Sequence, residues 1–330
     1  MTQPSPGAAA RALEVLAPAK LNLFLHVVGR RADGYHLLQS VFVPIDWCDA
    51  LRIELLEDGR LERVDEARAA SALTPALPAQ DLCLRAAHAL QAASGTSWGA
   101  RIRLDKRIPQ GAGLGGGSSD AAAVLLALNE LWTLHWSDQQ LRELAVGLGA
   151  DVPFFIEGRP AWVEGIGDRL TVLDGDQALP AVLREAAYVV IKPPQGVATA
   201  AIFSTPDLPR DTKPAILSDF LAAVQTASGS LLADPAGSTR GAFGGLAGSW
   251  RNDLQGAAQR LCPQIAQAAQ WLEQRFGNSR MTGSGSAVFA IVTSEHDRQR
   301  AQALLDELPP DWEARVCRAL RAHPRPQARG

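Results

Sequence analysis

The hydrophobic pattern early in the chain predicts two β-strands joined by a polar turn. Within residues 14–28 hydrophobic side chains, Leu21 and Leu23 among them, recur at every second position, which is the period of a strand with two distinct faces. A charged stretch flanked by glycines at residues 29–34 interrupts the pattern, and a second hydrophobic run follows at 41–45. We therefore expect a strand, a turn and a strand in this order.

Helical spacing begins after residue 80. Hydrophobic residues recur three and four positions apart within residues 81–93, and a short run at 100–104 predicts a strand. That strand leads into a glycine-rich stretch, after which an apolar stripe at helical spacing predicts a helix that begins near Ser118 or Ser119. The glycine-rich stretch thus connects a strand directly to a helix.

Later segments carry capping and turn signals. Ser137, with Gln140 three residues on, forms a capping-box pattern and predicts a helix over residues 138–146. Hydrophobic runs at 188–191 and 280–293 predict further strands, the second as a pair around a Gly-Ser-Gly turn. Pro, Ser and Gly punctuate the segment between them, which predicts a series of helices separated by loops.

The chain length and a change in sequence pattern near residue 186 predict two domains. After this point Pro, Ser and Gly interrupt the predicted helices more often. The chain has 330 residues, enough for two cores that share a cleft. We expect domains at residues 11–185 and 186–317. The ends, residues 1–10 and 318–330, offer little to bury and are expected to be disordered tails.

Composition excludes several classes of function. Hydrophobic residues make up 47% of the chain and charged residues 20%, as in ordinary globular proteins. The net charge of −3 provides no global positive field for nucleic acid or anionic lipid, and no hydrophobic run approaches the roughly 20 residues that span a bilayer. We expect a small-molecule ligand, no nucleic acid and no membrane, and no protein partner is evident.

Cysteine usage and the start of the chain favour the cytoplasm. The cysteines show neither a CxxC pair nor a histidine at ligand spacing, which argues against zinc and against a disulfide framework. Residues 1–10 lack the basic and apolar regions of a secretory signal. The scattered thiols are Cys48, Cys83, Cys262 and Cys317.

Residues 109–120 carry the clearest chemical signal. Five glycines lie within seven positions directly before a helix, in the sequence Pro-Gln-Gly-Ala-Gly-Leu-Gly-Gly-Gly-Ser-Ser-Asp. Glycines let backbone N–H groups converge on an anion, and the helix N-terminus adds unpaired donors, so phosphate is the expected ligand. The candidate phosphate-binding residues are Pro109, Gly111, Ala112, Gly113, Leu114, Gly115, Gly116, Gly117, Ser118 and Ser119.

Two better-known glycine loops do not fit. A Walker A loop ends in Gly-Lys-Ser/Thr, whereas no lysine follows these glycines. Gly111, Gly113 and Gly116 satisfy GxGxxG, but a dinucleotide-binding unit continues from its helix into a strand that ends in an acid, and here a second helix follows. An NAD-dependent oxidoreductase remains an alternative that nicotinamide binding would test.

Three further features have two interpretations each on the residues alone. Lys20 and Asn22 share one face of the first strand, and they line either a cleft or a solvated surface. Residues 281–287 form either a tight hairpin or a backbone turn that closes over a ligand. Lys106 either approaches a nucleotide or ends a solvated strand.

Taken together, residues 18–22, 109–123 and 281–287 resemble the three ordered motifs of the GHMP kinase superfamily, which includes galactose, homoserine and mevalonate kinases. The resemblance implies an α+β fold of two domains. The first is expected to resemble ribosomal protein S5, and the second to be a ferredoxin-like α/β sandwich. It also implies ATP as the phosphate donor, Mg²⁺ with the nucleotide, and an alcohol as the acceptor.

Residues 17–39, 149–154 and 196–203 are similar to one branch of this superfamily. Its implied reaction is transfer of the ATP γ-phosphate to the 2-hydroxyl of 4-diphosphocytidyl-2-C-methyl-D-erythritol, in the non-mevalonate route to isoprenoid precursors. In this branch the residues matching Asp151 and Lys20 flank the reacting hydroxyl. A carboxylate can accept the alcohol proton while an ammonium keeps that carboxylate ionised, so the assignment is chemically sensible.

The resemblance also implies a set of substrate and adenine contacts. Asn22 and Thr199 match residues that contact the methylerythritol portion, Tyr35 and Phe203 match two aromatics that sandwich cytosine, and His36 matches the residue that reads the base edge. The adenine pocket departs from the family, which often has Asn where this chain has Asp81, and an aspartate cannot donate an amide hydrogen bond. No acidic metal ligand accompanies the serines, so the Mg²⁺ ligands are left unassigned.

Two other functions remain to be weighed. A rival kinase of the superfamily would not respond to the cytidine compound, and loss of Tyr35 or Phe203 would not affect it. The other alternative is a ligand sensor that keeps the fold without catalysis. The presence of both Lys20 and Asp151 argues against it.

Overall fold

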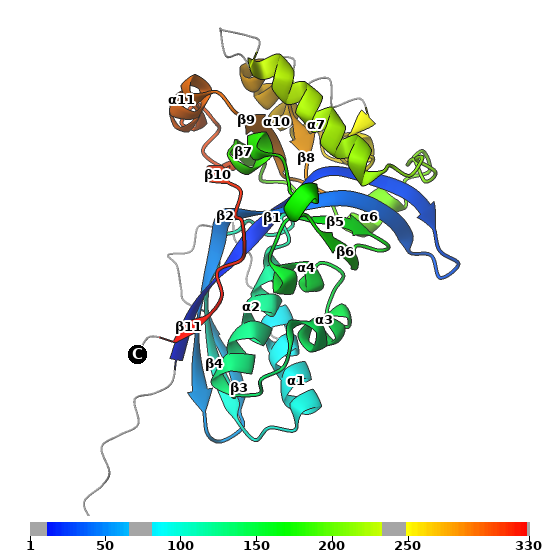
Figure 1. Ribbon diagram of the computed structural model, residues 1–330. Coiled ribbons are helices and arrows are strands. Elements are labelled where there is room, and N and C mark those ends of the chain that lie inside the picture. Colours follow the sequence, from blue (N-terminus) through cyan, green and yellow to red (C-terminus); the bar gives the residue numbers. More distant parts are fainter. Residues whose placement is uncertain (1–11, 66–80, 233–248, 329–330) are drawn as a thin grey trace, which may run out of the picture.

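Two antiparallel-rich sheets, each covered by helices, make up the described protein (Figure 1). The structure is a computed structural model, and it describes residues 12–65, 81–232 and 249–328. The expected tail at residues 1–10 lies outside the described residues.

Seven strands of the described residues form the first sheet. Its main path runs β11-β1-β2-β4-β3, while β5 pairs with β2 and β6 with β5. Only β3 and β4 pair in parallel, and the other pairs are antiparallel. The strands are β1 (Ala12–Arg30), β2 (His36–Leu56), β3 (Leu61–Asp65), β4 (Gly99–Asp105), β5 (Ala161–Glu164), β6 (Arg169–Val172) and β11 (Gln327–Ala328).

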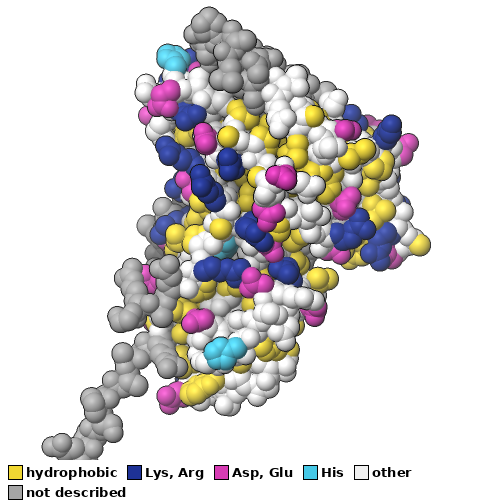
Figure 2. All heavy atoms as spheres, viewed as in Figure 1, with side chains coloured by type: hydrophobic (Ala, Val, Ile, Leu, Met, Phe, Trp, Pro, Cys, Tyr) yellow, Lys and Arg dark blue, Asp and Glu magenta, His cyan; other side chains and the backbone are white. Residues whose placement is uncertain are grey.

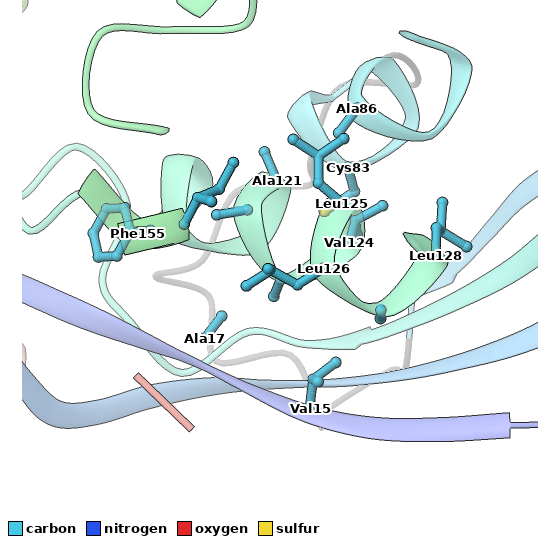
Figure 3. Packing of buried hydrophobic residues seen from close by; sticks show 14 of the residues in the cluster. Val15, Ala17, Cys83, Ala86, Ala121, Val124, Leu125, Leu126, Leu128 and Phe155 are labelled. Carbon is cyan, nitrogen blue, oxygen red and sulfur yellow. The ribbon is translucent and has the colours of Figure 1, made fainter. Parts of the chain in front are cut away.

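A buried helix, α2 (Gly116–Leu131), forms the centre of the first core. It packs between the sheet and α1 (Leu82–Ser94), with Val124 and Leu125 fully buried (Figure 3). The predicted helix over residues 138–146 is α3 (Asp138–Val146), and Ser137 caps it in the expected capping box. A short α4 (Val152–Glu157) follows.

Helix α2 begins earlier than the sequence suggested. The pattern placed its start at Ser118 or Ser119, whereas Gly116 and Gly117 already form the first turn. Gly115 is the N-cap residue and has φ 73°, a left-handed conformation that glycine adopts without strain. The glycine-rich stretch therefore includes the helix N-terminus itself.

The second sheet is antiparallel with strand order β10-β7-β9-β8. Its core is formed mainly against helix α10, whose Ile265, Leu272 and Phe276 are fully buried. The elements are β7 (Ala187–Lys192), β8 (Arg280–Met281), β9 (Val288–Val292), β10 (Glu313–Arg318), α6 (Thr199–Phe203), α7 (Leu217–Leu232), α9 (Gln255–Leu261), α10 (Pro263–Phe276) and α11 (Glu295–Leu305). A 3₁₀ turn, η1 (Gly175–Gln177), and α5 (Ala181–Arg184) connect the two sheets. The predicted two-domain α+β fold is confirmed.

The long β1–β2 hairpin belongs to both cores. Leu21 and Phe24 of β1 share one hydrophobic cluster with Tyr188 and Phe289 of the second sheet. A proposed boundary near residue 186 divides the covalent chain, but in space the hairpin packs against both sheets.

Residues 319–328, here named the return segment, lead from β10 back to the first sheet (Figure 1). His323 is buried, its backbone N–H donates to Gly158 O at 2.6 Å, and β11 pairs with β1. The expectation of a disordered tail from residue 318 onward is therefore wrong for residues 318–328. The sequence misled because the partners of this segment come from distant elements.

Candidate active site

Three segments that are far apart in the sequence meet where the two sheets join. They are residues 18–22 of β1, residues 109–117, here named the glycine loop, and residues 282–287, the β8–β9 turn. Backbone hydrogen bonds connect them: Lys20 N to Leu114 O (2.9 Å), Ser286 N to Gly111 O (3.2 Å) and Ala287 N to Ala112 O (3.0 Å). The structure thus brings together the three motifs that the sequence singled out.

Close approach explains two of the loop glycines. Gly113 has φ 73°, and a Cβ on it would lie 2.3 Å from Thr282 O of the β8–β9 turn. A Cβ on Gly115 would lie 2.9 Å from the Phe155 ring. A side chain at Gly113 would therefore force the glycine loop away from the β8–β9 turn, and one at Gly115 would press against α4.

Lys20 and Asp151 form a pair at the floor of the junction. Lys20 Nζ lies 3.7 Å from Asp151 Oδ2, and the lysine side chain is buried while 30% of the aspartate side chain is exposed. Asp151 is the N-cap residue of α4 and does not use its side chain to cap the helix, so its carboxylate is available. Burial lowers the pKa of Lys20, and the charge of Asp151 opposes this shift.

Asn22 holds the lysine in place. Its Oδ1 accepts a hydrogen bond from Lys20 Nζ and another from Thr282 Oγ1 at 3.2 Å, while its Nδ2 donates to Ser40 Oγ at 3.0 Å. One amide N–H of Asn22 is left for a ligand. The predicted shared face of Lys20 and Asn22 is therefore a buried polar cluster and not a solvated surface.

The glycine loop lines a cavity of about 510 Å³, here named the donor cavity. The first turn of α2 faces it and contains no acidic side chain. Backbone N–H groups in a first helical turn have no intrahelical acceptor, and the helix dipole is positive at this end. The cavity is therefore suited to phosphate groups.

Lys106 lies in a buried charge cluster beneath the loop. Its Nζ donates to Asp120 Oδ2 at 2.7 Å and to Asp49 Oδ2, and Asp49 Oδ1 accepts from the backbone N–H of Ile108 at 2.7 Å. Burial alone would lower the pKa of Lys106, but the two carboxylates raise it, so the amine stays charged. The interpretation of Lys106 as the solvated end of a strand is wrong. Its side chain, directly after β4, binds Asp49 of β2 and Asp120 of α2.

Asp81 lines the same cavity but already has two protein partners. Its Oδ1 accepts from Leu84 N at 3.2 Å and caps α1, and its Oδ2 lies 2.9 Å from Arg63 Nη1. The acidic residue in this position is explained by these partners, since an asparagine would lose the ion pair.

A second cavity of about 250 Å³, the acceptor cavity, lies on the other side of the loop. Its lining includes the Lys20–Asp151 pair, Thr199 and Phe203. Gly113 and Gly115 line both cavities, so the two spaces adjoin at the glycine loop. Thr199 Oγ1 and Ser284 Oγ are 2.7 Å apart, which connects α6 to the β8–β9 turn.

The candidate base-binding residues come from the tip of the β1–β2 hairpin and from α6. Tyr35 is 62% exposed, and His36 stacks on Phe203 with ring centroids 4.6 Å apart and planes 23° apart. His36 thus covers one face of the Phe203 ring. Burial, followed by the charges of Arg210 and Arg30, lowers the pKa of His36 and favours the neutral ring.

Sequence reasoning missed several residues that hold the site together. Asn252 Nδ2 donates to Met281 O and Gly283 O, each at 2.8 Å, and so fixes the β8–β9 turn. Asp49 could have been noticed as an acidic residue within the largely hydrophobic β2. Asn252 and Arg210 carry no such signal, because they lie in irregular segments.

The part of the chain that the structure describes contains no group of three or more His, Cys, Asp or Glu side chains that could hold a metal ion. It also contains no helix of the length and hydropathy that crosses a bilayer. On the face shown in Figure 2, basic and acidic side chains are interspersed. At the start of α2, Ser119 Oγ and Asp120 Oδ1 are buried without a hydrogen-bond partner.

Comparison with known proteins decides the family. Residues 81–159 match the model of the GHMP kinases N terminal domain, and residues 236–310 match that of the GHMP kinases C terminal. The 4-diphosphocytidyl-2-C-methyl-D-erythritol kinase of Polaromonas naphthalenivorans (strain CJ2) is 50% identical over 311 residues, covering 94% of each chain. This chain belongs to the 4-diphosphocytidyl-2-C-methyl-D-erythritol kinase family. The family member from Paracidovorax citrulli (strain AAC00-1) is 49% identical and covers 93% of this chain and 94% of its own.

Solved structures agree with this family. A crystal structure of 4-(cytidine 5'-diphospho)-2C-methyl-D-erythritol kinase matches with a TM-score of 0.68 and 34% identity, over 92% of this chain and 99% of the other. A homoserine kinase from Cytophaga hutchinsonii, 17% identical, matches with a TM-score of 0.66 over 98% and 99% of the two chains and shows the common fold alone. The chain is accordingly a kinase, and the resemblance drawn from its three motifs is confirmed.

Proposed function

We propose that this chain transfers the γ-phosphoryl group of ATP to the 2-hydroxyl of 4-diphosphocytidyl-2-C-methyl-D-erythritol. The observation that carries the proposal is the junction of the two cavities at Gly113 and Gly115, beside the Lys20–Asp151 pair. A phosphate donor on the glycine loop and an alcohol in the acceptor cavity would meet there. The reaction would feed the non-mevalonate route to isoprenoid precursors.

Asp151 is the proposed proton acceptor. Its carboxylate takes the proton of the 2-hydroxyl as the alcohol oxygen forms a bond to the γ-phosphorus, and the bond from that phosphorus to the β,γ-bridging oxygen breaks to release ADP. Lys20 Nζ lies 3.7 Å from that carboxylate and offers positive charge beside the transferred group. Asn22 fixes the lysine and has one amide N–H left to donate to the methylerythritol portion.

The donor is proposed to bind with its phosphates on the glycine loop and at the first turn of α2, where Ser118 adds a hydroxyl. The adenine is proposed to lie toward Asp81 and Leu82, at the edge of the same cavity. Lys106 stabilises the start of the glycine loop through Asp49, which also binds the backbone N–H of Ile108. Asp120 lines the donor cavity, and its unpartnered Oδ1 is of the ligand type that Mg²⁺ prefers; it would hold the ion together with the phosphates, where the ion neutralises phosphate charge.

The cytosine is proposed to stack between Tyr35 and the Phe203 face that His36 leaves open. Stacking on aromatic rings contributes about 1–3 kcal/mol per base in nucleic-acid sites. Thr199 reaches the methylerythritol portion from α6. We also place the reaction in the cytoplasm, which the four free cysteines support.

An assay of ADP release tests the function. Purified protein with Mg-ATP should release ADP only when 4-diphosphocytidyl-2-C-methyl-D-erythritol is present, and phosphorus NMR should detect a new phosphate monoester on the product. Homoserine and mevalonate serve as rival acceptors. Equal turnover with either of them, or no turnover with the cytidine compound, would contradict the proposal.

A further inference from the structure

Ser40 of β2 contacts the amide of Asn22 inside the buried polar cluster. Its Oγ donates a hydrogen bond to Phe24 O and accepts one from Asn22 Nδ2 at 3.0 Å. Both side chains are buried, and both residues line the acceptor cavity. The hydroxyl of Ser40 thus joins the backbone of β1 to the side chain that holds Lys20.

The chemistry of these groups fixes where the hydrogens lie. A serine hydroxyl has one hydrogen and a carbonyl oxygen cannot donate, so the hydrogen of Ser40 belongs to the bond with Phe24 O. Ser40 Oγ can then only accept, and the atom of Asn22 that faces it must be the amide nitrogen. An amide turned over would place the oxygen of Asn22 against the oxygen of Ser40, with no hydrogen between them.

Thr282 holds the same amide from the β8–β9 turn, but less strictly. Its Oγ1 accepts from the backbone N–H of Asn22 at 3.0 Å and donates to Asn22 Oδ1 at 3.2 Å. The hydroxyl hydrogen of Thr282 also has Gly113 O within 3.5 Å, whereas that of Ser40 is taken up by Phe24 O. Ser40 is therefore the stricter of the two constraints on the amide.

The orientation of this amide decides what Lys20 meets. Asn22 Oδ1 accepts from Lys20 Nζ, and an ammonium has hydrogens to donate but no acceptor. The bond fixes a long and flexible side chain at a point where its nitrogen lies 3.7 Å from Asp151 Oδ2. A turned amide would present N–H groups to the ammonium and push it away from this position.

We propose that Ser40 is a positioning residue, which sets the orientation of the Asn22 amide and thereby holds the Lys20 ammonium beside Asp151. The proposal rests on the proposed function, because it concerns the reaction at that pair. It goes further in assigning part of the geometry of the pair to a hydroxyl that acts through another side chain.

The first test observes the amide and needs no activity. In ¹H,¹⁵N NMR of the full chain labelled at asparagine, one Nδ2 hydrogen of Asn22 should exchange slowly with solvent, because Ser40 binds it. Ser40→Ala should make this exchange fast, while Ser40→Thr keeps the hydroxyl and should preserve the slow exchange. An Asn22 amide signal that is unchanged in Ser40→Ala would overturn the proposal.

The matched control is Ser94→Ala. Ser94 Oγ likewise donates to a backbone carbonyl, that of Gln91, and accepts from a backbone N–H, that of Thr96. It lies in the last turn of α1 and has no contact with Asn22. This control should leave both the Asn22 signal and the kinetics unchanged.

The second test measures kinetics. Ser40→Ala should lower kcat by about 10-fold, the size expected when a hydrogen bond is lost and its partner is left unpaired. The KM for ATP should stay unchanged, and Ser40→Thr should restore kcat. In a Lys20→Met background, Ser40→Ala should change kcat by less than about 2-fold, because the side chain through which Ser40 acts is absent.

Two kinetic outcomes would overturn the role of Ser40. If Ser40 bound the acceptor directly, its loss would appear mainly in the KM for the acceptor. If Ser40 only supported the fold, the loss of kcat would be equal with and without Lys20, and Ser40→Thr would give no specific rescue.

The outcomes also separate the two proposals. No turnover of the cytidine compound by the unaltered protein would contradict the proposed function, while the NMR test would still report the amide orientation. Normal turnover, with an unchanged kcat in Ser40→Ala, would contradict only the role of Ser40.

Discussion

Lys20 Nζ lies 3.7 Å from Asp151 Oδ2, and the two partners differ in exposure, with 4% of the lysine side chain accessible against 30% of the aspartate side chain. The pair therefore has a closed side and an open side. The ammonium is held from behind by Asn22 and lies 4.8 Å from the centre of the Phe42 ring, while the carboxylate faces the acceptor cavity. An incoming hydroxyl would reach the carboxylate first.

Asp151→Asn should lower kcat by about 10²- to 10⁴-fold, the usual contribution of a general base. Nucleotide binding should persist, because the donor cavity lies on the other side of the glycine loop. ADP release and a titration with an ATP analogue measure the two properties. Asp176→Asn makes the same chemical change at an exposed position of η1 and should have no effect. Full turnover in Asp151→Asn would remove Asp151 as the proton acceptor.

Gly113→Ala should disrupt the junction of the three motifs. The added Cβ would approach Thr282 O to 2.3 Å at a positive φ, so the glycine loop or the β8–β9 turn must move. We expect weaker nucleotide binding and at least a roughly 10-fold loss of kcat/KM, since displaced catalytic groups are costly.

The matched control for Gly113→Ala is Gly95→Ala. Gly95 has φ 67°, but a Cβ at this position would meet nothing within 4 Å. This control should cost only the local backbone strain, about 1 kcal/mol, and leave the kinetics unchanged. Similar kinetics in both variants would show that the close approach does not matter.

Lys106→Met should destabilise the fold by about 3–5 kcal/mol, because it leaves Asp49 and Asp120 buried beside each other without their cation. Denaturant unfolding measures this change. Lys213→Met, at an exposed lysine, should change the stability by less than about 0.5 kcal/mol. A stability equal to that of the unaltered protein would mean that the cluster contributes little.

His323 should make the fold less stable in acid. Burial lowers the pKa of this side chain from 6.5 to about 4. Above pH 6.5 the ring is neutral in both the folded and the unfolded state and has no pH-dependent effect. As the pH falls from 6.5 toward 4, the unfolded chain binds a proton that the folded chain resists. The free energy of unfolding should therefore fall by about 3 kcal/mol at most from this group.

Denaturant unfolding at several pH values tests this prediction with His323→Leu, which should flatten the stability profile between pH 6.5 and about 4. His88→Leu removes an exposed histidine of α1 and should leave the profile as it was. Parallel profiles in all three proteins would exclude His323 as a source of acid sensitivity.

The hydrophobic periodicity, together with capping and turn residues, predicted much of the fold. The capping box at Ser137 specified the start of α3, because a cap depends on residues only three positions apart. The density of glycines located the turn at the start of α2, although it misplaced the first helical residue. Such signals are local, and they succeed wherever neighbouring residues determine the conformation.

The remaining features depend on contacts between distant segments. The pairing of Lys106 with Asp49 and Asp120, and the contact of Arg210 with His36, need the tertiary structure to be recognised. The roles of Tyr35 and Phe203 in the sequence analysis came from family resemblance alone. Without it, their residue types would have suggested ordinary core aromatics.

Strand β11 has a consequence for the behaviour of the protein in solution. It pairs with β1 at Leu13 and Glu14, and so covers the outer hydrogen-bonding groups of the strand at that position. An uncovered strand edge is a template onto which another chain can add. By folding back over β1, the return segment reduces the opportunity for edge-to-edge self-association. A variant shortened before residue 319 should therefore aggregate more readily than the full chain.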